Sequence, residues 1–346
     1  MARLDRAIFM PRIITLSEEP IDSRAEEFRK LHIPIYCLGI SRLQSLLVGF
    51  SKLRKFLKEN PVDIIQSQGV RSDLLNALLR HPRPRIATQR NDPFADYPML
   101  YGRLIGYMMA HAHISILRQL PKVVTCSYSI EAAIRSHRVT CSTIQNGVDN
   151  TTVHAVSPSE KKEIRASLKL PTAGILFLWA APFIARKNPL TLIKAFNSLQ
   201  NHEKRHLCLL GDGPILEPAT DLACQRPNIS FKGNVDNVGE YMKAADCFVS
   251  TSLSEGLPNS VIEALSWGLP TILSDIPAHR EIHKTDQRVG SLFPLNNLQV
   301  LIDLLTNFRH DNSIATISRA LVLDHFNADT TAHQYQSLYQ EVLTVF

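Results

Sequence analysis

SEGLPNSVIEAL, residues 254–265, is the stretch of sequence from which the fold is most readily inferred. It follows closely on the apolar segment CFVS, residues 247–250, which has the composition of a buried β-strand. Asn259 is a favoured N-cap residue, so we predict that a helix begins there and continues to Trp267, where Gly268 ends it. Strand, loop and helix in this order are typical of one unit of a parallel α/β sheet.

Two glutamates in this stretch have different predicted surroundings. Glu255 lies in the loop that faces the helix N-terminus, and Glu263 lies about one turn inside the helix. Several backbone amides of this turn, which Pro258 stiffens, can point at an anion: those of Gly256, Leu257, Asn259 and Ser260. A loop carboxylate, a helix carboxylate and a set of amides can together hold a negatively charged, polyhydroxylated ligand such as a nucleotide sugar.

With EGLP at 255–258 and EA at 263–264, the spacing Glu-x7-Glu resembles the signature of family 4 glycosyltransferases, which are retaining enzymes of the GT-B fold. Other segments resemble the family in order and spacing: RKNP (186–189), LGDGP (210–214), FKG (231–233), AD (245–246), GLP (268–270) and IPAHRE (276–281). An ordered set of motifs is far more specific than one pair of glutamates. The resemblance covers roughly residues 143–345. It implies an α/β fold with two Rossmann-like, doubly wound domains that face each other across a cleft.

The composition is that of a soluble globular protein. Of 346 residues, 45% are apolar and 20% are charged, and the length allows two domains. Six cysteines are scattered with no C-x-x-C pair, which indicates reduced thiols and a cytoplasmic location. No apolar stretch is long enough to span a bilayer, and Arg12 interrupts the apolar residues near the N-terminus, which argues against a signal peptide.

Positive charge is concentrated in the N-terminal third. Residues 1–120 contain 18 Lys and Arg against 11 Asp and Glu, whereas the net charge of the whole chain is +6. Two interpretations are open: a surface that only keeps the protein soluble, or peripheral contact with an acidic partner, such as anionic lipid at the inner membrane face or a pyrophosphate-bearing acceptor. We do not expect nucleic acid, because no basic strand interleaved with aromatic residues and no zinc-finger spacing occur.

Strand-like and helix-like segments alternate along the chain, as a doubly wound parallel sheet requires. The predicted strands are 12–16, 35–38, 62–65, 86–88 and 123–126 in the first half, and the second half begins with 175–179. An amphipathic helix is predicted at 43–57, for which we favour packing against the sheet over membrane contact.

Two local signals mark the domain boundary. IQNGVD, residues 144–149, resembles the turn before the family's interdomain linker, and its Asn-Gly pair predicts a positive φ. SPSE, residues 157–160, predicts a capping box with proline first in the helix. We therefore divide the chain into an N-terminal acceptor-binding domain (1–153), a C-terminal nucleotide-sugar-binding domain (154–330) and a final helix (331–346) that packs back toward the N-terminal domain.

The family's first strand and glycine-rich turn are not found before the strand at 12–16. Residues 1–6 resemble the end of the helix that normally follows that turn. Because the first strand of a doubly wound sheet is central, we expect either a start recorded about 25–35 residues too late or a truncated domain. The alternative of an inactive remnant or non-catalytic partner subunit therefore stays open.

Arg186 and Lys187 lie between a predicted strand and a helix that begins with Asn188 and Pro189, and two cations at such a place suit a diphosphate. The resemblance implies that Lys187 neutralises the departing nucleoside diphosphate with help from Arg186. It also implies that Glu263 binds the ribose hydroxyls and that Glu255 contacts the transferred sugar. The non-functional alternatives are a solvated charged loop and two surface glutamates near a helix N-terminus.

Other candidate residues are weaker. Gly211 and Gly213 end a strand and permit close approach of a ligand, although a tight turn would also need them. In the first domain, where relatives often carry a histidine, Arg90 and Asp92 are candidates to orient acceptor and phosphate, and a polar loop is an equal alternative.

We expect no metal and no cofactor. His111 and His113 have metal-like spacing but no evident third ligand, so we interpret them as structural. No Asp-x-Asp motif lies near the candidate site, and enzymes of the GT-B fold generally need no metal.

Taken together, these features predict a retaining glycosyltransferase of polysaccharide biosynthesis. It would move a sugar from a nucleotide-sugar donor, a UDP-sugar in preference to a GDP-sugar, to a hydroxyl of a saccharide or lipid-linked saccharide. A nucleotide-sugar epimerase or a phosphorylase of the same fold is the alternative. A glycosidase also uses two carboxylates, but the neighbouring phosphate-binding signals favour a nucleotide donor.

Overall fold

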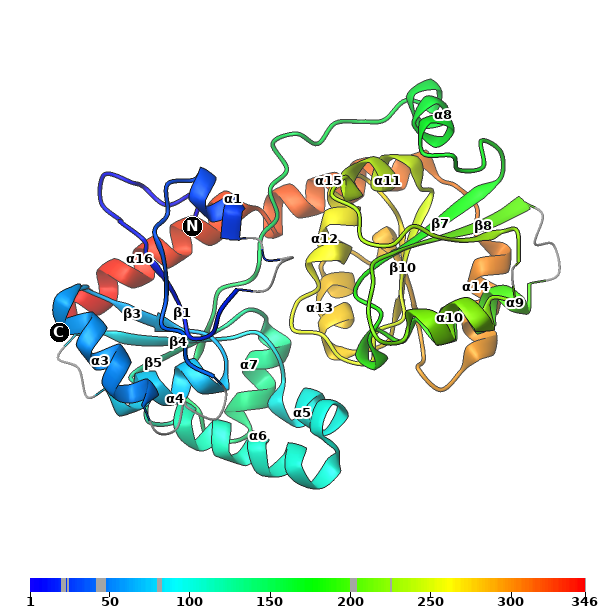
Figure 1. Ribbon diagram of the computed structural model, residues 1–346. Coiled ribbons are helices and arrows are strands. Elements are labelled where there is room, and N and C mark those ends of the chain that lie inside the picture. Colours follow the sequence, from blue (N-terminus) through cyan, green and yellow to red (C-terminus); the bar gives the residue numbers. More distant parts are fainter. Residues whose placement is uncertain are drawn as a thin grey trace. The chain divides into compact units, whose positions relative to one another are not determined.

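The computed structural model of the protein describes residues 1–19, 23, 25–41, 48–79, 83–199, 204–224 and 226–345. The chain forms two compact α/β units (Figure 1). Unit 1 consists of residues 1–97, 103–145 and 329–346, and unit 2 consists of residues 98–102 and 146–328. The predicted α/β class is therefore confirmed, and unit 1 is assembled from both ends of the chain.

Unit 2 contains a parallel sheet with strand order β12-β11-β10-β7-β8-β9. The strands are β7 (Ile175–Ala180), β8 (Arg205–Leu210), β9 (Ile229–Phe231), β10 (Cys247–Ser250), β11 (Thr271–Ser274) and β12 (Gly290–Phe293). The chain first adds β8 and β9 on one side of β7, and then continues with β10 on the other side. β7 and β10 therefore flank the topological switch point, where ligands bind in doubly wound sheets.

Helices cover both faces of this sheet (Figure 1). In chain order they are α8 (Pro158–Ser167), η1 (Ala185–Lys187), α9 (Pro189–Asn197), α10 (Leu216–Leu222), α11 (Val238–Ala244), α12 (Asn259–Ser266), α13 (Pro277–Thr285), η3 (Gln287–Val289), α14 (Leu298–Asn307) and α15 (Asn312–His325). On the face formed by α9, α10 and α14, the fully buried side chains include Phe177, Trp179, Phe196 and Leu305. Burial of each stabilises the fold by about 1.5–3 kcal/mol.

A buried ion pair ties α8 to the sheet. Asp246, just before β10, accepts hydrogen bonds from Arg165 Nη2 at 2.6 Å, from Lys161 Nζ at 3.0 Å and from the backbone N–H of Leu176 at 2.8 Å. Burial alone would raise the pKa of Asp246, but Lys161 and Arg165 outweigh burial and hold the pKa below its ordinary value. Asp246 is thus a structural residue.

Unit 1 contains two parallel sheets, β1-β2 and β3-β4-β5-β6. Its strands are β1 (Ile13–Thr15), β2 (Ile35–Cys37), β3 (Ile65–Ser67), β4 (Arg85–Gln89), β5 (Lys122–Thr125) and β6 (Ser142–Thr143). Its helices are α1 (Ala25–Lys30), α3 (Gly49–Glu59), α4 (Val70–Leu78), α5 (Pro93–Tyr101, which continues into unit 2), α6 (Arg103–Leu117), α7 (Tyr128–Arg135) and most of α16 (Ala328–Val345). In the described part of unit 1, neither β1 nor β3 pairs with a strand of the other sheet.

The predicted strand at 62–65 is wrong by several residues, because β3 begins only at Ile65. Val62 instead packs against the apolar cluster of α3 and α4. Part of the helix predicted at 43–57 lies outside the described residues. In the part that is described, Leu53 and Leu57 of α3 are buried in this same cluster, which agrees with packing rather than membrane contact.

The C-terminal helix α16 completes the core of unit 1. Leu338 and Val342 are buried against Ile86 of β4, Val124 of β5 and Ile144. These contacts join the last helix of the chain to strands that lie more than two hundred residues earlier. The core of unit 1 therefore depends on both ends of the chain.

The segment between β6 and α8 pairs with the segment that leads into α16. Val148 donates its N–H to the carbonyl of Phe326 at 2.9 Å and accepts the N–H of Ala328 at 3.1 Å. The predicted positive φ at Gly147 is wrong. Glycine is required there for another reason, because a Cβ would lie 2.4 Å from backbone atoms of Asn327.

Replacing Asp246 with asparagine should lower the free energy of unfolding by about 3–5 kcal/mol, because Arg165 and Lys161 lose their buried partner. The Asp246 pKa is lower in the folded than in the unfolded chain. Its stabilisation is therefore complete above the ordinary carboxyl pKa and is lost as the pH falls through the folded value. Urea unfolding between neutral and acidic pH measures both effects. The matched exposed change Asp303→Asn should alter stability little.

Candidate active site

The candidate site lies at the carboxyl ends of β7 and β10, which are neighbours in the sheet. After β7 the chain forms the short helix η1, which carries Arg186 and Lys187, and then enters α9. After β10 the chain forms the loop that carries Glu255 and then enters α12. Parallel strands bring these two loops to the same edge of the sheet, at the topological switch point.

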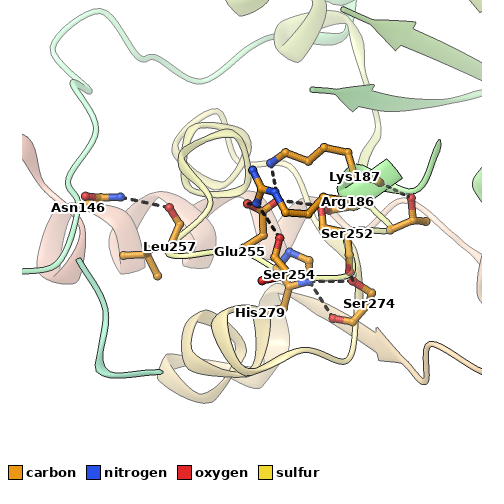
Figure 2. Close-up of polar contacts among 11 residues, drawn as sticks. Asn146, Arg186, Lys187, Ser252, Ser254, Glu255, Leu257, Ser274 and His279 are labelled. Carbon is orange, nitrogen blue, oxygen red and sulfur yellow. Dashed lines mark hydrogen bonds and ion pairs between the residues drawn. The ribbon is translucent and has the colours of Figure 1, made fainter. Parts of the chain in front are cut away.

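Glu255 joins the two cations (Figure 2). Its Oε2 accepts a hydrogen bond from Arg186 Nη1 at 3.1 Å, and its Oε1 contacts Lys187 Nζ. Ser252 Oγ donates to the same Oε1 at 2.7 Å. The Glu255 side chain is only 7% exposed, so these charges interact away from bulk water. Sequence reasoning named all three charged residues, and the structure brings them together.

Burial alone would raise the pKa of Glu255. Lys187, Arg186 and the Ser252 hydroxyl outweigh burial, so the pKa lies below its ordinary value. Glu255 is therefore ionised at neutral pH. An ionised carboxylate here offsets the repulsion between an ammonium and a guanidinium that are held side by side.

Hydrogen bonds to backbone carbonyls fix the two loops to each other. Leu253 donates its N–H to the Arg186 carbonyl at 2.8 Å, and Arg186 Nη1 donates to the Ser254 carbonyl at 2.8 Å. Thr251 Oγ1 donates to the carbonyl of Asn188 at 2.8 Å. The backbone that carries the cations therefore cannot shift without the backbone that carries Glu255.

His279 of α13 is a part of the site that sequence reasoning missed, although its motif IPAHRE was recognised. Its Nδ1 lies 2.8 Å from the carbonyl oxygen of Ser274, and Ser274 Oγ in turn donates to the Ser252 carbonyl at 2.6 Å (Figure 2). A carbonyl only accepts, so the proton is assigned to Nδ1. Burial lowers the pKa of His279 to about 4, which leaves the ring neutral at pH 7.

The other nitrogen of His279, Nε2, is buried and has no hydrogen-bond partner among the described residues. With the proton on Nδ1, this nitrogen is an acceptor. His279 therefore contributes one donated bond, which holds Ser274 and, through it, the Ser252 carbonyl in the Glu255 loop.

Gly211 and Gly213, after β8, allow close packing against the loop that follows β7. A Cβ at Gly211 would lie 2.0 Å from the Ala181 carbonyl oxygen, and one at Gly213 would lie 2.6 Å from that of Phe183. Both glycines have positive φ, at 125° and 152°. The close approach in the structure is thus to protein backbone, and their predicted proximity to ligand stays a prediction.

Helix α12 differs from its prediction at one end. Asn259 is its first residue rather than its N-cap, a position that Pro258 occupies without a side-chain hydrogen bond. The helix ends as predicted, because Gly268 has a φ of 80° and donates to the Leu265 carbonyl. Leu269 donates to the Ala264 carbonyl, which completes a Schellman motif.

Glu263 lies one turn inside α12 and is half-buried. In the first turn, Ser260 is half-buried and Asn259 is exposed. The amides of Asn259 and Ser260 have no carbonyl partner inside an α-helix, which leaves them oriented for an anion. Gly256 and Leu257 are buried in the loop before them.

Arg90 and Asp92 belong to unit 1, where they follow β4. Arg90 is exposed, and Asp92 Oδ1 accepts the N–H of Phe94 at 2.9 Å and so caps α5. Burial raises the pKa of Asp92 despite this hydrogen bond. The cap accounts for an aspartate at this position, and a role toward an acceptor stays a prediction.

His113 is structural, as predicted. It is fully buried, with Nδ1 2.7 Å from the Tyr97 hydroxyl and Nε2 2.8 Å from Asp73 Oδ2. Among the residues that the structure describes, no group of three or more His, Cys, Asp or Glu is arranged to hold a metal ion. None of the six cysteines forms a disulfide.

Comparison with known proteins defines the class. The family model Glycosyltransferase Family 4 matches residues 2–152, and the family model Glycosyl transferases group 1 matches residues 160–319. The chain therefore belongs to the family 4 type of glycosyltransferases with the GT-B fold. The family membership and the enzyme class expected from the sequence are both confirmed.

Three similar proteins illustrate the range of the family. UDP-Gal:alpha-D-GlcNAc-diphosphoundecaprenol alpha-1,3-galactosyltransferase from Escherichia coli is 24% identical over 92% of this chain and 85% of its own length. The Bacillus subtilis protein TuaC, assigned as a glycosyltransferase of teichuronic acid biosynthesis, is 32% identical over 51% of this chain and 46% of its own length. HepE from Anabaena, solved in complex with UDP-glucose, has a TM-score of 0.78 at 17% identity, covering 97% of this chain and 100% of HepE.

Replacing His279 with leucine should lower the free energy of unfolding by about 1–3 kcal/mol, because the Ser274 carbonyl loses its buried donor. His279→Asn should cost less, because an asparagine side chain can place an N–H near the same carbonyl. Urea unfolding of both variants at pH 7 makes the comparison. A leucine variant as stable as the wild type would show that the histidine does not support the Glu255 loop.

Proposed function

We propose that the protein is a retaining glycosyltransferase that moves a sugar from a UDP-sugar to a hydroxyl of a saccharide or lipid-linked saccharide. One observation supports this proposal above the others. Arg186, Lys187 and the ionised Glu255 are clustered at the topological switch point, beside the N-terminal ends of α9 and α12. Phosphate groups bind at such helix ends, and cations there strengthen the binding.

Lys187 and Arg186 bind the diphosphate of the donor. An ammonium carries three donors and a guanidinium five, so both can hold phosphate oxygens while they contact Glu255. Negative charge grows on the diphosphate as the sugar leaves, and cations already in position stabilise that charge without reorganising. The contacts that fix the two loops to each other supply this preorganisation.

Glu263 and Glu255 divide the remaining recognition of the donor. Glu263 accepts the ribose hydroxyls as an ionised carboxylate, while the amides of Gly256, Leu257, Asn259 and Ser260 face the anion. Glu255 contacts hydroxyls of the transferred sugar and keeps Lys187 and Arg186 close to the bond that breaks. Gly211 and Gly213 let the donor approach the backbone after β8.

Unit 1 binds the acceptor, with Arg90 and Asp92 as the residues that orient it. The acceptor hydroxyl attacks the anomeric carbon from the same face that the diphosphate leaves, and the departing phosphate takes the hydroxyl proton. The anomeric configuration is thereby retained. Positive charge from Lys187 and Arg186 serves where other enzymes use a metal ion, so the reaction needs no metal and no cofactor.

A UDP-sugar is the preferred donor, and a polysaccharide or lipid-linked precursor is the acceptor class. The Escherichia coli relative is named for a UDP-Gal donor and a diphosphoundecaprenol-linked acceptor, and HepE was solved with UDP-glucose. None of the described helices is long and apolar enough to cross a bilayer. The enzyme works in the cytoplasm and meets lipid-linked acceptors at the membrane surface.

UDP should stabilise the protein against thermal unfolding more than GDP or ADP does. A nucleotide at about 100 times its dissociation constant adds about 2.7 kcal/mol when the unfolded chain does not bind it. Glu263→Ala should lose most of this stabilisation. Glu217→Ala is the matched control, since Glu217 is an exposed residue in the first turn of α10. A cooperative transition that no nucleotide shifts would contradict the proposed donor site.

The two glutamates should affect different kinetic constants. Glu263→Ala should weaken UDP binding by about tenfold or more, because a hydrogen bond to a charged group contributes about 1.5–3 kcal/mol. Glu255→Gln should mainly lower turnover, with a much smaller change in UDP affinity. Calorimetry with UDP and a sugar-transfer assay with a lipid-linked acceptor separate the two effects. Equal losses of UDP affinity, or conversion of the donor without any acceptor, would refute this division of roles.

A further inference from the structure

Exposed apolar side chains are concentrated at the N-terminal end of α6 in unit 1. Leu104 is 76% exposed, Ile105 57%, Tyr107 44% and Met108 65%. We call these four residues the α6 tip. In most soluble proteins exposed apolar residues are scattered singly, and a contiguous group of them marks an interaction surface.

The α6 tip is held out on a firmly anchored helix. Ala110 and Leu117 have no exposed surface, and Ile114 is 2% exposed, so the later turns of α6 belong to the core of unit 1. At about 100° per residue, the four side chains of the tip cover roughly 160° of the helix circumference. The exposed apolar surface at this end of α6 is therefore broader than a narrow stripe along the helix.

The apolar character begins before α6. Just before α6 in the sequence, Met99, Leu100 and Tyr101 of α5, which belong to unit 2, are 40%, 57% and 48% exposed. Tyrosine combines an apolar ring with a polar hydroxyl and is favoured at the boundary between water and lipid.

The chain segment that contains the α6 tip carries charge of one sign. Residues 97–130 contain no Asp or Glu, and Arg103 is the exposed first residue of α6. The N-terminal end of a helix also carries a partial positive charge. A surface that is apolar and positive, with no acidic residue within this stretch, is complementary to a bilayer that contains anionic lipid.

We propose that the α6 tip docks unit 1 on the surface of an anionic membrane, with its apolar side chains among the lipid chains and Arg103 at the phosphate level. A bilayer fits the exposed apolar side chains of the α6 tip better than a protein partner does, because lipid adapts to the shape of the helix. Helix α3, which is amphipathic and also lies in the basic N-terminal third, does not present an apolar surface for this role, since its Leu53 and Leu57 are buried in a cluster with residues of α4.

Docking through α6 deepens the proposed function, because it brings the proposed acceptor-binding unit to the place where a lipid-linked acceptor is found. It does not depend on sugar transfer, and binding to vesicles can be measured with no donor or acceptor present. Failure of one proposal is therefore distinguishable from failure of the other.

The test is sedimentation of the full chain with vesicles of phosphatidylglycerol and phosphatidylcholine, and with vesicles of phosphatidylcholine alone. The wild type should bind the anionic vesicles. Leu104→Gln combined with Met108→Gln should weaken that binding by about tenfold or more. Arg103→Gln should weaken it less and reduce its sensitivity to salt. Leu323→Gln is the matched control, because Leu323 is a 54% exposed leucine on α15, in unit 2.

An unchanged melting temperature would show that the double variant is folded. The proposal is overturned if the wild type stays in the supernatant, or if the double variant binds as the wild type does. Equal binding to neutral vesicles would overturn the role of charge. A dimer in lipid-free solution that the double variant abolishes would show that the α6 tip contacts a second copy of the chain instead.

Discussion

The candidate site depends on one buried carboxylate that bridges two cations on a neighbouring loop. Glu255 carries negative charge that allows Lys187 and Arg186 to lie side by side at the edge of the sheet. The surrounding structure holds this contact through hydrogen bonds to backbone carbonyls between the loops after β7 and β10. A parallel sheet brings two such loops together only where its strand order reverses. The strand order therefore determines where the charged site lies.

The supporting residues around Glu255 show how a polar site is maintained inside an apolar unit. Ser252, Ser274 and His279 are buried. Ser252 donates to Glu255, Ser274 donates to the Ser252 carbonyl, and His279 in turn holds the Ser274 carbonyl. His279 does this as a neutral ring, so it adds no third positive charge next to Lys187. The site thus combines strong local charge with a small net charge, which suits a ligand that arrives with negative charge of its own.

Much of unit 2 could be predicted from the sequence because its signals are local. The loop from Glu255 to Pro258, the helix stop at Gly268 and the paired cations before α9 all follow from short motifs. Contacts between distant segments could not be predicted in the same way. Gly147 illustrates this limit, because its glycine is explained by the backbone of Asn327, which no local pattern near residue 147 reveals.

Hydrophobic periodicity did not show which apolar residues are buried and which are exposed. Residues 43–57 have an amphipathic pattern, and in the described part of that segment the apolar face is buried. The α6 tip has no clean periodicity, because a helix that is apolar all round resembles a core helix in sequence. Only the folded structure shows that the first turns of α6 are exposed while the later turns are buried. The position of β3 was missed for a similar reason, since Val62 is apolar but packs rather than pairs.

The division of unit 1 between both ends of the chain has a consequence for its biosynthesis. Strands β4 and β5 are made early, but Leu338 and Val342, which cover them, are made more than two hundred residues later. Nearly all of unit 2 is one continuous segment and can complete its sheet while the chain is still growing. The usual order, in which the N-terminal domain folds first, is therefore reversed here. Until α16 is synthesised, the strands of unit 1 keep an apolar face that Leu338 and Val342 do not yet cover.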